Sequence, residues 1–150
     1  MQRLDHRGAE AVTTRSARAQ ALVEAALVLP LLILVMVGLF DLGRAVYADS
    51  TLSNAARVGS RIAIVNQNVG QIQAAAATKA AALDLLPADV SVSFRTNPTD
   101  PTSTCSPMRI GCVAFVTVTY QFHPAVPIEG LVGPISLTST SSQRVEHAAP

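Results

Sequence analysis

Few residues in this sequence of 150 are of a type and spacing that could do chemistry. The three histidines are His6, His123 and His147. They lie far apart in the chain and predict no metal or catalytic site, and neither a glycine-rich phosphate loop nor a serine nucleophile motif is present. We therefore expect no enzyme, no cofactor, no bound metal and no small-molecule substrate. The candidates that remain are Glu24 and a pair of cysteines.

The cysteine pair predicts a disulfide rather than a metal site. Residues 106–111 separate Cys105 from Cys112, a spacing that fits none of the usual zinc patterns. A disulfide across so short a loop would contribute about 2 kcal/mol of stability by restricting the unfolded chain. It would also require an oxidising compartment. Two unpaired thiols are the alternative.

Glu24 is notable because of the residues around it. The run 25–40 contains no charged or polar side chain, and counting from Gln20 lengthens it to the span of a membrane helix, with Glu24 as the one interruption. An ionised carboxylate at the edge of hydrocarbon costs several kcal/mol unless it is paired or protonated. Glu24 is therefore a candidate functional residue. The alternative is that it lies shallow enough to reach the lipid headgroups.

The charges on either side of the apolar run predict its direction. Arginines precede it, whereas Asp41 and Arg44 cancel after it, so the N-terminus should face the cytoplasm. Pro30 should kink the helix without preventing it from spanning. A secretory signal cleaved after Ala48 is the alternative. The expected segments are a basic cytoplasmic leader over residues 1–19, a transmembrane helix over 20–40, an extracytoplasmic domain over 41–146 and a tail over 147–150.

The overall composition agrees with a membrane-anchored chain. Hydrophobic residues make up 49% of it and charged residues only 14%, which argues against disorder. The formal net charge is +1 and there is no block of like charges, so a nucleic-acid partner is not expected.

The residues after Phe40 predict a small α+β domain. Apolar residues continue at helical spacing to Ala63, so the membrane helix should become amphipathic, and within it Ala55, Gly59 and Ala63 allow close packing against either the protein's own sheet or a partner helix. A second helix is predicted over 71–86. About three antiparallel strands are predicted over 90–95, 113–122 and 135–145, the last rich in serine and threonine and hence an edge. Residues 1–17 and 147–150 should be unstructured.

Four stretches of the sequence carry a shared pattern. The first stretch reads AQALVEAALVLP over residues 19–30 and is followed by Gly38, Asp41, Gly43 and Arg44. The others lie within residues 55–61, VTVTYQFHP over 116–124, and ISLTSTSSQRVE over 135–146. Together they resemble TadE-like proteins, which are pseudopilins of the tight adherence system that builds Flp pili.

The resemblance implies a pilin-like fold and a role in pilus assembly. A prepilin peptidase would cut between Ala19 and Gln20, which makes Glu24 the fifth residue of the mature chain. The Glu24 carboxylate could then pair with the free amine of a neighbouring subunit's Gln20. The implied partners are the cytoplasmic membrane, other pilin-like subunits, the pilus assembly platform and the peptidase, with incorporation into a surface pilus left open. A generic membrane-anchored extracytoplasmic binding module is the alternative.

Overall fold

The computed structural model describes the backbone of residues 7–125 and 133–147, and the side chains from residue 19 onward within those ranges. It contains a long N-terminal helix, a second helix and a three-stranded antiparallel sheet. The predicted α+β class is therefore confirmed. The chain divides into two compact units, Met1–Phe40 and Asp41–Pro150.

Helix α1 spans Arg7–Ala63 and continues through Pro30. Residues 7–17, which were expected to be unstructured, are helical. The reason lies in their composition, since alanine and arginine are among the strongest helix formers and this stretch is rich in both. Pro30 is tolerated although it cannot donate the backbone hydrogen bond of its position.

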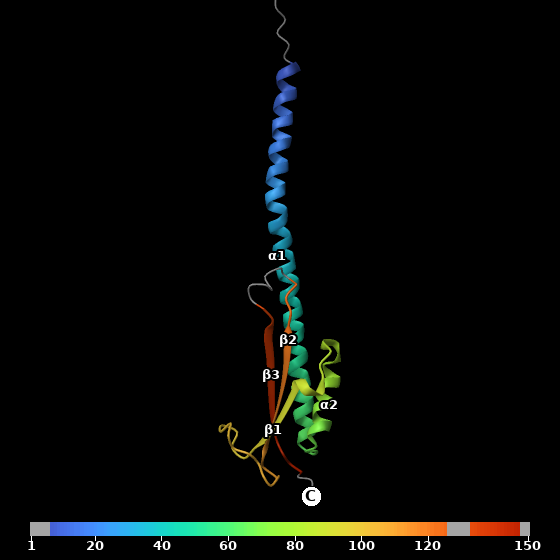
Figure 1. Cartoon of the computed structure of the whole chain (residues 1–150), viewed down its shortest axis with the longest axis vertical. Coiled ribbons are helices and arrows are strands. Elements are labelled where there is room, and N and C mark those ends of the chain that lie inside the picture. The colour runs from blue at the N-terminus through green and yellow to red at the C-terminus, as the bar shows by residue number, and fades with distance from the viewer. Residues whose placement is uncertain (1–6, 126–132, 148–150) are drawn as a thin grey trace, which may run out of the picture. The chain divides into compact units, whose positions relative to one another are not determined.

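The sheet has the strand order β1-β2-β3, with β1 at Val90–Arg95, β2 at Val113–Phe122 and β3 at Ile135–Arg144. The first two strands have the predicted bounds, and the third ends one residue earlier than predicted. Both neighbouring pairs are antiparallel. The expectation that β3 is an edge strand is confirmed, and β1 forms the opposite edge. Figure 1 shows the three strands beside the C-terminal part of α1.

One face of the sheet forms the core with α1 and the second helix. Val116 and Val118 of β2 are completely buried, together with Leu52 of α1 and Ile72 of the second helix. The opposite face carries mainly serine and threonine, and on it Thr117 and Thr140 share a hydrogen bond of 2.8 Å between their hydroxyl oxygens. The alternation of apolar and polar residues along the strands thus matches their two faces.

Helix α2 spans Val69–Lys79 and is shorter than the predicted helix over 71–86. Its N-terminal cap is Asn68, whose side chain accepts a hydrogen bond from the Gln71 amide. After Lys79 the chain forms two 3-10 turns, Ala81–Leu83 and Pro87–Asp89. Asp84 between them has a left-handed backbone with φ of 52°, which ends the helical path and allows Leu85 to be buried in the core. Tertiary packing therefore overrides the helix propensity of the alanine-rich sequence.

The C-terminal segment is more ordered than the sequence predicts. The backbone amide of His147 donates to the carbonyl oxygen of Ile64 at 3.2 Å. The Gln67 amide group donates to the His147 carbonyl at 2.7 Å. His147 was expected to begin an unstructured tail, but these bonds attach it to the end of α1. Residues 148–150 lie outside the described part of the chain.

Candidate functional site

The described side chains of the first unit present an apolar surface without a partner. Its large side chains are exposed along all sides of the helix; they include Leu22, Val23, Leu27, Val28, Leu29, Leu31, Leu32, Ile33, Leu34, Val35, Met36, Leu39 and Phe40. Among the described residues, one helical stretch, Ala19–Ala63, is long and apolar enough to contain a membrane span. Such a surface is stable only when lipid or other apolar helices cover it.

Ala19, Gln20 and Glu24 lie near the start of this surface. All three are within α1 and exposed. Glu24 follows Gln20 by one helical turn, so the two side chains share a face of α1. Within residues 19–125 and 133–147 the structure shows no ion pair for Glu24.

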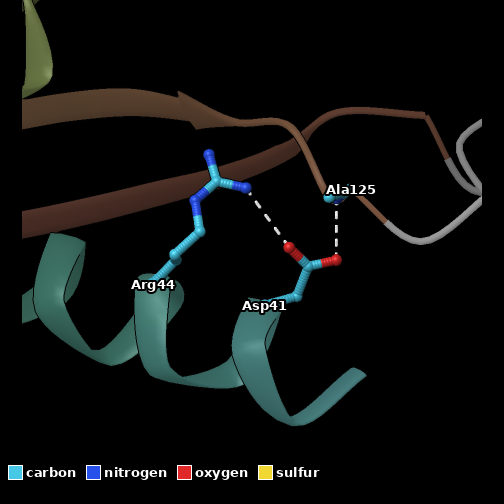
Figure 2. A network of polar contacts seen from close by, with 3 residues as sticks. All are labelled: Asp41, Arg44 and Ala125. Carbon is cyan, nitrogen blue, oxygen red and sulfur yellow. Dashed lines mark hydrogen bonds and ion pairs between the residues drawn. The ribbon is translucent and has the colours of Figure 1, made fainter. Parts of the chain in front are cut away.

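A buried polar network occupies the start of the second unit. Asp41 is only 6% exposed, and both of its carboxylate oxygens accept hydrogen bonds. One oxygen accepts from the Arg44 guanidinium at 3.2 Å, and the other accepts from the backbone amide of Ala125 at 2.7 Å. Figure 2 shows that Ala125 follows the end of β2 and faces the Asp41 carboxylate. The network thus joins α1 to the end of the central strand.

Arg44 also contacts the sheet directly. Its guanidinium carbon lies 5.3 Å from the centre of the Phe122 ring, which is within cation–π range. From the sequence, Asp41 and Arg44 are two opposite charges that cancel at the end of the apolar run. The sequence analysis did not predict that they connect two elements of the head. Their spacing of three on a helix was a usable signal for their mutual contact, but nothing in the sequence pointed to Ala125.

The small residues of α1 pack within the protein itself. Ala55, Gly59 and Ala63 are all buried. A Cβ atom added at Gly59 would lie 2.9 Å from a methyl carbon of Val116 and 3.3 Å from the Cβ of Ala76. Of the two readings that the sequence left open, packing against the protein's own sheet and second helix accounts for these contacts.

The two cysteines form a disulfide in the head. The bond lies where three strands are tied together, because the Cys105 amide donates to Phe94 at the end of β1 and the Val145 amide donates to Cys112. Both cysteines are buried and belong to the core. The disulfide therefore closes a loop within the β1–β2 connection, and the two backbone hydrogen bonds attach this loop to β1 and to the end of β3.

Two further features of the described surface bear on chemistry, a hollow beside α2 and the positions of the histidines. A shallow hollow beside α2 is lined mainly by alanine and leucine, with Thr78 and Asp84 as its polar side chains. Neither has a histidine or second carboxylate among its neighbours in the hollow. His123 and His147 lie at the end of β2 and after β3, whereas His6 is outside the described residues. Within the described residues, no group of three or more His, Cys, Asp or Glu side chains could hold a metal ion.

Together these features define a small α+β protein with one candidate membrane helix near its N-terminus. The family model for TadE-like protein matches residues 19–61. The resemblance drawn from the sequence is thereby confirmed over that segment, which includes Ala19, Gln20, Glu24, Asp41 and Gly59. Comparison with curated proteins found no match, and comparison with solved structures found none either.

Proposed function

We propose that this chain is a non-catalytic, TadE-like component of a tight adherence pilus system. It is anchored in the cytoplasmic membrane by α1, with residues 1–19 as a cytoplasmic leader, 20–40 as the spanning segment and 41–146 as an extracytoplasmic head. The observation that carries the proposal is the family match over residues 19–61. That segment holds the exposed apolar surface and the exposed Glu24.

The proposed processing site lies between Ala19 and Gln20. A prepilin peptidase would remove the leader and leave Gln20 as the first residue. Its new α-amino group is largely protonated near neutral pH. In an assembly of such helices this amine would pair with Glu24 of a neighbouring subunit, because an unpaired carboxylate among apolar helices is costly. The pair would favour one register between subunits.

The identity of the N-terminal residue tests this proposal. The full-length protein is isolated from membranes of cells with and without a prepilin peptidase, and its first residue is identified by mass spectrometry. We expect Gln20 only in cells that have the peptidase. A chain that begins at Met1 in both cells would instead favour a simple anchored binding module. A chain that begins at Asp49 would show that the apolar run is a secretory signal.

A charge-neutralising substitution tests the role of Glu24. Glu24→Gln should leave the protein in the membrane but abolish its copurification with other pilin-like subunits. Asp49→Asn is the matched control, because Asp49 is an exposed carboxylate on α1 outside the proposed span. The control should copurify normally. Normal pilus assembly with Glu24→Gln would contradict the pairing.

A further inference from the structure

The exposed side of α1 stays apolar beyond the end of the charge-free run. In the second unit, Leu42 and Val46 are each 61% exposed and Tyr47 is 56% exposed. The next exposed side chains on the helix are polar, Asp49 and Ser50. We call Leu42, Val46 and Tyr47 the apolar collar. The sequence places the end of the apolar surface at Phe40, whereas the exposed side chains place it at Tyr47.

The difference arises from the buried network at the start of the head. Asp41 is the first charge after the run, but its carboxylate is buried and accepts hydrogen bonds from Arg44 and Ala125. Arg44 is partly exposed, and its guanidinium is folded back over the Phe122 ring. Because the Arg44 guanidinium pairs with the buried Asp41 carboxylate and lies against Phe122, these two charges do not require the collar to stand in bulk water. Arginine can also extend its charged end toward headgroups while its stem remains in apolar surroundings.

A second element adds apolar surface at the same end of the head. Ile135, the first residue of β3, is exposed and lies opposite Phe122 in the β2–β3 register. Arg44 lies over that same Phe122 ring. The end of the head that carries the Asp41 network therefore presents apolar side chains from the sheet as well as from α1.

We propose that the apolar collar lies in the interfacial layer of the lipid bilayer, between acyl chains and headgroups. This inference rests on the membrane anchor of the proposed function. Residues 41–47 rise about 10 Å along a helix, which is comparable to the roughly 5–10 Å depth at which apolar helical faces enter the headgroup and acyl boundary. Tyr47 at the outer limit of the collar is a residue type enriched at membrane interfaces. The head would thus be seated on the membrane rather than held above it.

The absence of tryptophan from the sequence allows a direct test, because each single-tryptophan variant reports one position. The full chain is reconstituted in phosphatidylcholine and phosphatidylglycerol vesicles whose lipids carry bromine either near the headgroup end or near the methyl end of the acyl chain. The collar variants are Val46→Trp and Tyr47→Trp. Leu32→Trp reports the span, and Leu86→Trp reports an exposed apolar site on the head. All four sites are exposed, so the substitutions should not prevent folding.

We expect the collar variants to show blue-shifted emission and stronger quenching by shallow bromine than by deep bromine. Leu32→Trp should be quenched most strongly by deep bromine, and Leu86→Trp should be unquenched. If Leu32→Trp is quenched while the collar variants behave like Leu86→Trp, the collar is in water and the inference is wrong. Blue-shifted emission from the collar variants without bromine quenching would mean that protein covers the collar. That result would also contradict the proposed position of the collar in the bilayer. Loss of quenching at Leu32→Trp would refute the anchor itself and with it the proposed function.

Discussion

The two parts of α1 have similar helix-forming sequences and opposite surroundings. Leu32 in the first unit is 53% exposed, whereas Leu52 in the second is completely buried. The difference is the presence of a partner from the same chain, since the sheet and α2 cover residues 52–63, whereas residues 19–36, 39 and 40 are exposed. The exposed apolar surface of the first part agrees with the membrane anchor that we propose.

The two parts of α1 also differ in their residue types, in agreement with an exposed surface in the first part and a packed one in the second. The first part carries large side chains around its circumference, which suits a surface that lipid can cover. The second part places Ala55, Gly59 and Ala63 against its own core, where small residues allow the helix to approach the sheet closely. The TadE-like match includes both parts. The matched segment of this chain thus combines an outward surface with an internal packing surface.

The largest expected effect separates the two parts by one matched substitution. Leu52→Ala should destabilise the head by about 2–5 kcal/mol, because it removes buried methyl groups and leaves a cavity. Leu32→Ala makes the same chemical change at an exposed site and should leave head stability unchanged within about 0.5 kcal/mol. Hydrogen exchange of the β2 amides, measured on the full chain in micelles, reports both. If the β2 amides lose protection from exchange equally in the two variants, the two parts of α1 do not differ as described.

The Asp41 network should give a smaller and more local effect. Asp41→Ala removes a charged acceptor from the Ala125 amide and should cost about 2 kcal/mol. Asp41→Asn keeps one acceptor oxygen and should cost less. Exposed Asp49→Ala is the control and should be near neutral. Hydrogen exchange should rise first at residues 122–125. Unchanged exchange there would show that the network does not hold the end of β2.

Substitution of alanine for either of two glycines in α1 should change the stability of the protein in opposite directions. Gly59→Ala places a methyl group 2.9 Å from Val116, and the cost of overpacking should exceed the gain in helix propensity, for a net loss of about 1 kcal/mol. The Cβ atom that Gly43→Ala adds has no atom within 4 Å, so this substitution should stabilise the helix by up to about 1 kcal/mol. The midpoint of thermal unfolding compares the variants. A stabilising Gly59→Ala would mean that α1 does not pack closely on the sheet there.

The smallest effect concerns an exposed loop of the head. The Thr102 hydroxyl and amide donate to the Asp100 carboxylate at 2.7 and 2.9 Å and hold its pKa below the ordinary 3.8. The ionised form is favoured in the folded state, so this local contribution is present above the unfolded pKa and is lost as pH falls through the folded one. Thr102→Ala should raise the pKa of Asp100 toward 3.8, whereas Thr102→Ser should not. Carbon-detected NMR titration measures the shift, and an unchanged pKa in Thr102→Ala would contradict it.

Local patterns in the sequence predicted most of the elements. Residues 113–122 alternate so regularly that the bounds of β2 were correct, and the long apolar run predicted the helix that contains Glu24. The family resemblance over residues 19–61 also came from residue types and their order alone. These features follow from period, length and composition, which are properties of neighbouring residues.

Features that depend on contacts between distant residues required the tertiary structure. The sequence could not show that Asp41 accepts a hydrogen bond from Ala125, so it placed the end of the apolar surface at Phe40, seven residues before Tyr47. The sequence also could not decide whether Gly59 faces the protein's own core or a partner helix. It did not predict that α2 ends at Lys79 and that Leu85 is buried. In each case the outcome depends on which surface lies opposite a side chain, and helical or strand periodicity gives only the direction in which that side chain points.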